Sequence, residues 1–195
     1  MADTKNAQST WRSDFGILAM GTHPSRLMPD DTPAKAGSPS FKPVKEFGRI
    51  SISPSTELVF YADVYRGHPY VSIRTFLKSG EYTGPTKAGV TLTPEIVAGM
   101  IKALETLPRD GAEAPEKELA RFTRRVGVEL VLRVARFRDT VGIDLREWID
   151  DANYKGWSKK GVRIPYGEAP RAVDCLKAMQ AFLAEKPKPV PKPET

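Results

Sequence analysis

The sequence predicts an α+β protein made of two tandem units, each a series of β-strands followed by one helix. Two observations support this prediction. When the chain is shifted by 72 residues, residues 57–105 align with residues 129–177 without a gap. In both segments, stretches with period-two apolar residues are followed by a stretch with helical spacing. A unit of about 50 residues buries too little apolar surface to be stable alone, so the two units are expected to pack together.

The aligned segments share residues at positions that matter for a fold: glycines, arginines and apolar residues. The identical pairs are Glu57/Glu129, Leu58/Leu130, Val59/Val131, Arg66/Arg138, Arg74/Arg146, Tyr82/Tyr154, Gly84/Gly156, Lys87/Lys159, Gly89/Gly161, Val90/Val162 and Leu104/Leu176. Identities concentrated at such positions indicate duplication of one ancestral unit.

The strands are predicted in chain order. Residues 57–66 and 129–138 are rich in Val, Leu, Phe and Arg and end at a turn, which is typical of a strand. The next segments, YVSIRTFL and GIDLREWI, alternate apolar and polar residues, so one face is apolar and the other carries an arginine and an aromatic residue. A polar, glycine-containing hairpin and a last short strand at Val90 and Leu92, or Val162 and Ile164, complete the β-part of each unit.

A helix closes each unit. Thr93-Pro94-Glu95 supplies an N-cap threonine and a proline at the first helical position. An apolar stripe follows in each copy. Its members are Ile96, Met100, Ile101, Leu104 and Leu107 in the first copy, and Ala172, Val173, Leu176, Met179 and Phe182 in the second.

The ends and the connection differ in composition from the two units. The start is rich in Pro, Ser, Thr, Ala and Asp without a period, which indicates disorder, and the end alternates Lys and Pro, which favours an extended chain. Between the units, prolines and a glycine indicate a linker, with one helical turn at Glu116–Arg121. The predicted boundaries are a disordered arm (1–45), the first repeat (46–107), a linker (108–121), the second repeat (122–184) and a Lys/Pro-rich tail (185–195).

Composition excludes several classes of protein. No stretch approaches the roughly 20 apolar residues of a membrane span, and no signal peptide is present, so an intracellular location is expected. The single cysteine, Cys175, excludes an intramolecular disulfide and is expected in the core. Neither histidine has a metal-ligand partner at suitable spacing, and no catalytic constellation is found, so the chain is predicted to be no enzyme and to need no cofactor or metal. The net charge of +6 favours anionic partners.

Basic and aromatic residues gather on the predicted polar strand faces and hairpins. Such a β-surface is typical of single-stranded nucleic-acid binding, because bases stack on aromatic rings while cations hold phosphates. A solvated sheet face without that function is the alternative. The candidate binding residues are Tyr65, Arg66, Arg74, Phe76, Lys87, Arg133, Phe137, Arg138, Arg146, Trp148, Lys155, Trp157, Lys159 and Lys160.

The order of these motifs resembles the C-terminal domain of the positive cofactor four family of transcriptional coactivators. The resemblance is carried by FRDTVGIDLREW followed by WSKKGVRI in the second copy, and by YRGHPYVSIRTF followed by TKAGVTLTPE in the first. It implies that each unit is a curved four-stranded antiparallel sheet plus one helix, packed as a pseudo-dimer whose sheets form grooves for single-stranded DNA. The sequence departs from the family at Leu77 and Ile149, where an aromatic residue is usual, and at Ala88, where a second basic residue is usual.

These observations predict a single-stranded nucleic-acid-binding protein, with DNA favoured, in transcription regulation or DNA maintenance. The alternatives are a protein–protein adaptor that kept the fold without the groove, and an RNA-binding module. The apolar patch at residues 11–20 either packs on its own domain or contacts a protein of the transcription machinery. The chain is expected to be a monomeric pseudo-dimer or a homo-oligomer.

Overall fold

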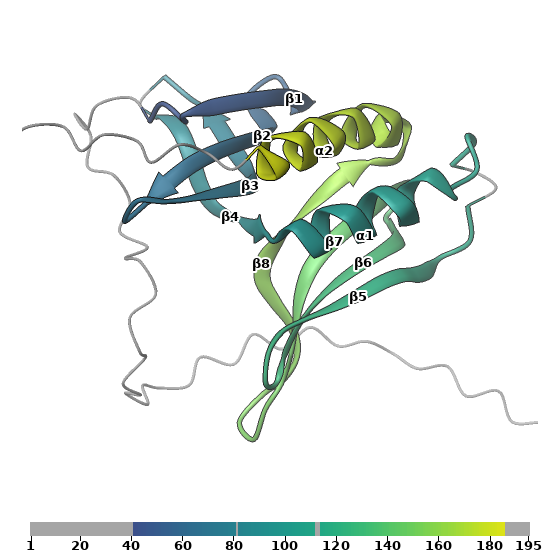
Figure 1. Cartoon of the computed structure of the whole chain (residues 1–195). Coiled ribbons are helices and arrows are strands. Elements are labelled where there is room, and N and C mark those ends of the chain that lie inside the picture. The colour runs from purple at the N-terminus through teal and green to yellow at the C-terminus, as the bar shows by residue number, and fades with distance from the viewer. Residues whose placement is uncertain (1–40, 81, 112–113, 186–195) are drawn as a thin grey trace, which may run out of the picture. The chain divides into compact units, whose positions relative to one another are not determined.

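A computed structural model of the chain describes residues 41–80, 82–111 and 114–185 (Figure 1). The described residues form two four-stranded antiparallel sheets, ordered β1-β2-β3-β4 and β5-β6-β7-β8, and a helix follows each sheet in the chain. The elements are β1 (Lys45–Ser53), β2 (Thr56–Tyr65), β3 (His68–Lys78), β4 (Thr83–Leu92), α1 (Pro94–Glu105), β5 (Lys117–Arg125), β6 (Val128–Phe137), β7 (Thr140–Asp150), β8 (Lys155–Pro165), the 3-10 turn η1 (Tyr166–Glu168) and α2 (Ala169–Ala184). The α+β class and the tandem four-stranded units are confirmed.

The two sheets repeat each other in register. Val59 of β2 pairs with Arg74 of β3, and the equivalent Val131 of β6 pairs with Arg146 of β7. Both sheets therefore place the same strand positions side by side. The N-cap prediction for α1 is confirmed as well, since the Thr93 hydroxyl accepts the Ile96 N–H at 3.4 Å.

The β2–β3 connection is a two-residue turn that needs positive φ. Tyr65 pairs with His68, which leaves Arg66 and Gly67 as the turn, with φ values of 52° and 81°. Glycine adopts such angles at little cost, and this kind of turn matches the twist of the two strands it joins. The equivalent Arg138 has a φ of 51°.

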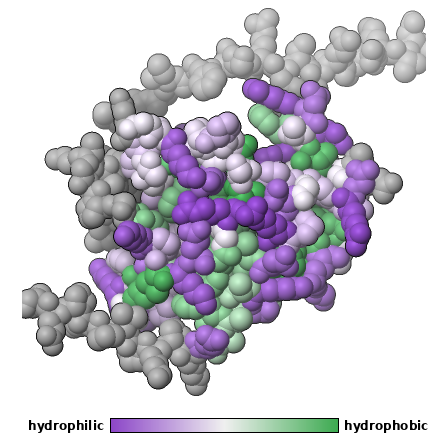
Figure 2. All heavy atoms as spheres, turned by 90° about the horizontal axis from the view of Figure 1, so that it is seen from above, coloured by the Kyte–Doolittle hydropathy of each residue, from purple (hydrophilic) through white to green (hydrophobic). Residues whose placement is uncertain are grey.

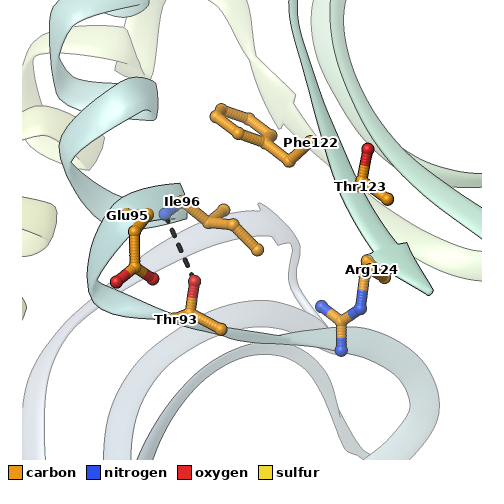
Figure 3. A pocket seen from close by; sticks show the side chains of 6 residues that line it. All are labelled: Thr93, Glu95, Ile96, Phe122, Thr123 and Arg124. Atoms are coloured by element: carbon orange, nitrogen blue, oxygen red, sulfur yellow. Dashed lines mark hydrogen bonds between the residues drawn. The ribbon is translucent and has the colours of Figure 1, made fainter.

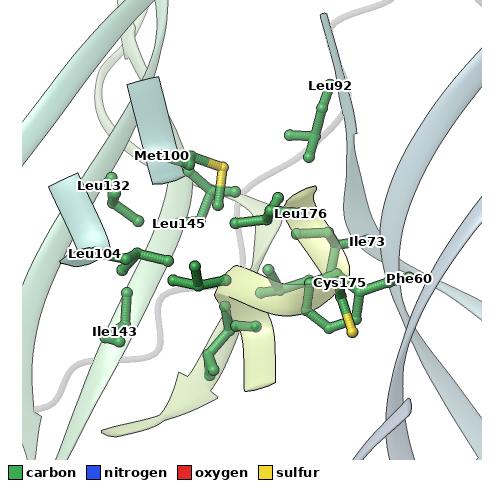
Figure 4. Packing of buried hydrophobic residues seen from close by; sticks show 14 of the residues in the cluster. Phe60, Ile73, Leu92, Met100, Leu104, Leu132, Ile143, Leu145, Cys175 and Leu176 are labelled. Carbon is green, nitrogen blue, oxygen red and sulfur yellow. The ribbon is translucent and has the colours of Figure 1, made fainter. Parts of the chain in front are cut away.

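Each helix packs against the sheet of the other unit. α1 contacts β5, and α2 contacts β1 and β2. The Cys175 thiol in α2 donates to the Phe47 carbonyl in β1 at 3.7 Å, and the Phe47 and Phe182 rings lie 5.6 Å apart. Figure 4 shows Cys175 toward the first sheet, and Met100 of α1 beside Leu145 of the second. This exchange of helices makes each unit part of the other's core.

One hydrophobic core therefore serves both units. A single set of buried residues includes Phe60 and Ile73 from the first sheet, Leu132 and Leu145 from the second, and Met100 from α1. The helices also contact each other, where Lys177 Nζ lies 2.8 Å from a Glu105 carboxylate oxygen, and β4 contacts β8. The predicted packing of the two repeats as a pseudo-dimer is confirmed.

Glycine allows the closest approaches between the two units. A Cβ at Gly48 in β1 would lie 2.6 Å from the Cys175 sulfur, and a Cβ at Gly99 in α1 would lie 2.5 Å from Cε1 of Phe122 in β5. Figure 3 shows Phe122 beside Ile96 at the start of α1, where these residues line a small pocket with Arg124. The Arg124 guanidinium in β5 also links the two units, because it donates a hydrogen bond to the Thr91 carbonyl in β4 at 2.5 Å.

The segment predicted as a linker with a helical turn at Glu116–Arg121 is different in the structure. β5 begins at Lys117, so the second sheet starts inside the predicted linker of residues 108–121. The prediction of a helical turn at Glu116–Arg121 was therefore wrong. The pairing of β5 shifts between Glu118 and Ala120, which marks a β-bulge at Leu119. The bulge breaks the period-two pattern and leaves Leu119 and Phe122 three residues apart, which resembles a helical pattern.

The predicted arm and tail are described only at their inner ends. β1 begins at Lys45, the last residue assigned to the arm, and α2 ends at Ala184. The patch at residues 11–20 and the Lys/Pro-rich residues from 186 onward lie outside the described residues. Among the helices that the structure describes, none is long and apolar enough to cross a membrane.

Candidate nucleic-acid interface

The face of the second sheet opposite the shared core brings arginines and tryptophans together. The register places Arg133 of β6 across from Asp144 of β7, and Trp148 of β7 across from Trp157 of β8. Arg146 lies between Asp144 and Trp148 on the same face, because side chains alternate along a strand. We call these five residues the second outer face.

Asp144 joins the two arginines of this face. Its carboxylate accepts hydrogen bonds from Arg146 Nη2 at 3.1 Å and from Arg133 Nη2 at 3.3 Å. The Asp144 side chain is only 5% exposed, whereas the Arg133 and Arg146 side chains are 33% and 29% exposed. A buried carboxylate needs such partners. The arrangement positions two accessible guanidinium groups and leaves an excess of one positive charge.

The two tryptophans form an aromatic surface next to these cations. Their ring centroids lie 4.8 Å apart with an interplanar angle of 73°, an edge-to-face arrangement. The Arg133 guanidinium lies 4.1 Å from the Trp157 ring centre, close enough for a cation–π interaction. Both indoles are half-buried. The surface thus combines flat rings with cationic hydrogen-bond donors, as base stacking and phosphate binding require.

A bulge in β8 exposes the lysines beside this face. The register moves from Arg146 opposite Gly161 to Trp148 opposite Trp157, which leaves Ser158, Lys159 and Lys160 outside the regular pairing. The Ser158 hydroxyl accepts the Lys160 N–H at 3.0 Å and stabilises this conformation. Both lysines are exposed.

Lys155, also predicted as a binding residue, lies at the start of β8. It is exposed, and its Nζ lies 2.8 Å from an Asp150 carboxylate oxygen, which is also exposed. An exposed ion pair of this kind is weak, so the pairing leaves Lys155 accessible to a phosphate.

The β2–β3 and β6–β7 turns each carry an exposed aromatic–arginine pair. The Arg66 guanidinium lies 5.3 Å from the Tyr65 ring centre, and the Arg138 guanidinium lies 5.4 Å from the Phe137 ring centre. Tyr65 is 44% exposed and Phe137 is 62% exposed. These four predicted residues therefore form two equivalent surface pairs, one at the tip of each hairpin.

The equivalent surface of the first sheet is aromatic instead of cationic. Tyr61 stands at the position of Arg133, and Phe76 stands at the position of Trp148. Val59, Tyr61 and Phe76 form a separate hydrophobic cluster with exposures of 0%, 2% and 6%. We call this cluster the first outer face. Phe76, one of the predicted stacking residues, is therefore buried in this structure.

Two rings from neighbouring positions cover the first outer face. Phe41, from the segment before β1, and Tyr70 of β3 pack against the cluster. Burial raises the pKa of Tyr61, and it raises the pKa of Tyr70 to about 12.

Arg66 lies at the hairpin tip, and the other two basic residues predicted on the first repeat are Arg74 in β3 and Lys87 in β4. Arg74 is half-buried and donates from Nη1 to the Thr86 carbonyl at 2.9 Å. Ser72 replaces the carboxylate that Asp144 supplies in the second sheet. Lys87 is exposed at the bulge of β4, and Ala88 stands where the second repeat has Lys160.

Figure 2 shows the hydropathy of the face seen from above the view of Figure 1. Hydrophilic side chains spread across this face, and hydrophobic residues appear as separate patches between them. This face is therefore mainly hydrophilic, and its described residues form no single large hydrophobic area.

The sequence analysis missed Arg49 and Arg121, which lie on the first strand of each sheet. Arg49 binds Glu46 at 2.7 Å and Glu57 at 2.9 Å, and Arg121 binds the equivalent Glu118 and Glu129. The hydrogen bond with Glu46 raises the pKa of Arg49, and the one with Arg121 lowers the pKa of Glu118. Extending the alignment at a spacing of 72 residues to Lys45/Lys117 would have revealed both arginines. Because two carboxylates bind each arginine, neither adds net positive charge to the outer faces.

Cysteine and side chains of metal-ligating types are also present among the residues that the structure describes. Cys175 is buried, and burial raises the pKa of its thiol, so the thiolate nucleophile is disfavoured. Within residues 41–80, 82–111 and 114–185, no three His, Cys, Asp or Glu side chains lie together in a way that could hold a metal ion.

Comparison with known families finds a match to the first repeat. Residues 53–103 match the model of the family described as Transcriptional Coactivator p15 (PC4). This match covers β2, β3, β4 and most of α1, and it confirms the resemblance drawn from the motifs. The second repeat has the same strand order and the same register. No curated protein matches the sequence.

Two solved structures from plants are similar to the chain. WHY3 from Arabidopsis thaliana has a TM-score of 0.40 and 10% sequence identity, covering 76% of this chain and 92% of WHY3. The plant transcriptional regulator PBF-2 has a TM-score of 0.39 and 14% identity, covering 73% of this chain and 85% of PBF-2. Both TM-scores are low for proteins of the same fold.

Proposed function

We propose that this protein binds single-stranded DNA through the second outer face and acts in transcription regulation or DNA maintenance. The family match over residues 53–103, to a transcriptional coactivator, supports the regulatory role. An intracellular location is part of this proposal, because that is where the nucleic acid is found.

The observation that carries the proposal is the grouping of Arg133, Arg146, Trp148 and Trp157 on one sheet face. The two guanidinium groups are held by Asp144 but keep about a third of their surface exposed. Arginine can bind a phosphate with two parallel hydrogen bonds and can also stack on a base. The half-buried indoles add stacking surfaces whose contribution is about 1–3 kcal/mol per base.

A single strand suits this surface better than a duplex does. Stacking on Trp148 or Trp157 requires a base whose π-face is free, and duplex bases are stacked on each other. The surface has few groups arranged to read particular base edges, so binding with little sequence preference is expected. Lys159 and Lys160, exposed at the rim, would contact the backbone.

The test is a titration followed by tryptophan fluorescence. The chain contains Trp11, Trp148 and Trp157, so a Trp11→Phe variant reports only on the second outer face. Single-stranded DNA, duplex DNA and single-stranded RNA of equal length are compared at two salt concentrations. We expect single-stranded DNA to quench the emission most strongly, with an affinity that falls as salt rises because counterions are released.

Three outcomes would change the assignment. Tighter binding of RNA would replace DNA as the ligand and keep the surface. Equal binding of duplex and single strand would contradict stacking on the indoles. Binding of no polymer by a folded protein would reject the nucleic-acid function and favour a protein–protein adaptor.

A further inference from the structure

The first outer face is covered by a residue from the chain's own N-terminal segment. The Phe41 ring lies 5.4 Å from the Tyr61 ring at an interplanar angle of 76°, and 5.9 Å from the Phe76 ring at 55°. Tyr61 and Phe76 are themselves 6.1 Å apart at 80°. Three rings therefore form one aromatic cluster, and Phe41 is its outermost described member, since it is only partly buried.

This contact marks the clearest difference between the two sheets. Phe76 is 6% exposed, whereas Trp148 at the equivalent position is half-buried and accessible. Phe41 is four residues before β1, and no part of the β-sheet pairing requires its ring to lie over Tyr61. The ring is held by aromatic packing and lies outside the strands, so it can leave without breaking a strand.

We propose that Phe41 is an intramolecular cover, whose ring occupies the place on the first sheet where a nucleotide base would stack, and whose release opens a second single-strand site on the same chain. The inference rests on the proposed function of the second outer face, because it assigns the same chemistry to the equivalent surface.

The first sheet also supplies the cations Arg74 and Lys87. Arg74 donates to the Thr86 carbonyl at 2.9 Å, and the uncharged Ser72 stands where Asp144 binds Arg146 in the second sheet. One carboxylate, that of Asp63, lies on the same face opposite Tyr70. The Arg49 guanidinium lies 5.8 Å from the Phe76 ring centre and adds to the packing there, while Glu46 and Glu57 balance its charge. An uncovered first face would therefore offer the Tyr61 and Phe76 rings beside Arg74 and the exposed Lys87.

The test compares Phe41→Ala with Val44→Ala in the full-length chain. Val44 belongs to the same segment and is 58% exposed, so its truncation leaves the cover in place. The number of short oligothymidylate strands bound per chain is measured at saturation. Phe41→Ala is expected to bind about twice as many strands as the wild type and Val44→Ala, and adding Phe76→Ala should remove the gain.

Removal of the cover is checked without DNA. Burial raises the pKa of Tyr61, and Phe41 lies against its ring, so Phe41→Ala should lower that pKa toward the ordinary tyrosine value. Absorbance of tyrosinate during an alkaline titration follows this change. Phe41→Ser provides a second variant, since a hydroxyl cannot replace the ring against Tyr61 and Phe76.

The same experiment in an Arg146→Ala/Trp148→Ala background separates the two proposals. Recovery of salt-dependent binding by Phe41→Ala in that background supports the cover. A Phe41→Ala protein with a lowered Tyr61 pKa but an unchanged number of bound strands overturns it. If the wild type binds no strand while Phe41→Ala binds one, the proposed function of the second outer face is rejected and the proposal that Phe41 is a cover is supported. If neither protein binds a strand, both proposals are rejected.

Discussion

The carboxylate of Asp144 accepts a hydrogen bond from Arg146 at 3.1 Å in the middle of the proposed DNA-binding face. The same carboxylate binds Arg133 at 3.3 Å. Asp144 therefore orients both arginines and also competes with a phosphate for them. If competition with phosphate is the larger effect, removing the charge of Asp144 should raise the affinity for DNA. If orientation of the arginines is the larger effect, it should lower that affinity.

We expect Asp144→Asn to increase affinity for single-stranded DNA by about fivefold, equivalent to about 1 kcal/mol. The amide keeps one acceptor oxygen for one of the two arginines, frees the other, and no longer neutralises them. Fluorescence titration at fixed salt measures the change. Asp139→Asn, at the exposed β6–β7 turn, is the matched control for charge alone. A loss of affinity in Asp144→Asn would mean that orientation by the full charge is the larger effect.

Arg146→Ala combined with Trp148→Ala should weaken single-strand binding by at least tenfold while leaving the fold intact. The two side chains share one strand face, and a stacked base contributes about 1–3 kcal/mol. Arg74→Ala, at the position equivalent to Arg146, should have a smaller effect than Arg146→Ala alone because Phe41 covers that face. Unchanged affinity in a folded double variant would contradict the assignment of the second outer face.

The second repeat is expected to contribute most of the phosphate contacts. Lys159 and Lys160 are both exposed at the β8 bulge, whereas the first repeat has Lys87 and Ala88 there. Lys159→Ala with Lys160→Ala should reduce the slope of log affinity against log salt by about 1.4, and Lys87→Ala by about 0.7 or less. A greater loss with Lys87→Ala than with the double variant would reverse this order.

Gly99→Ala should destabilise the protein although alanine is a better helix former. The added Cβ would lie 2.5 Å from Phe122, and overpacking costs about 1–3 kcal/mol against a helical gain of about 1 kcal/mol. We expect a net loss of about 1–2 kcal/mol in the free energy of unfolding, measured with urea. Gly167→Ala, where no atom lies within 4 Å, is the control and should change little. Recovery of stability by adding Phe122→Leu would locate the effect at the contact between the units.

The shared core predicts a monomer that unfolds in one transition. α1 packs on β5 of the second unit and α2 on β1 and β2 of the first, so a separated unit lacks the helix that its sheet needs. Sedimentation or mass photometry measures the mass, and thermal unfolding followed by circular dichroism measures the cooperativity. Two repeats that each fold when expressed alone, or an obligate dimer of full chains, would contradict this expectation.

The sequence by itself determined the features that depend on local patterns. The period-two alternation in residues 70–77 and 142–149 predicted β3 and β7 and the faces of Val71 and Arg74. Thr93 and Pro94 predicted the start of α1, because capping involves only neighbouring residues. The alignment at a spacing of 72 residues predicted that both units have the same order of strands and helix.

Only the tertiary structure decided what depends on contacts between distant segments. The bulge at Leu119 hid β5, since an extra residue disrupts the alternation that identifies a strand. The exchange of helices depends on how two faces fit, as Gly99 fits Phe122. Phe76 and Trp148 have the same position in the alternation, yet one is buried because Phe41 reaches it from 35 residues earlier in the chain. Local periodicity reports the side on which a residue lies, and only the folded chain determines what else lies there.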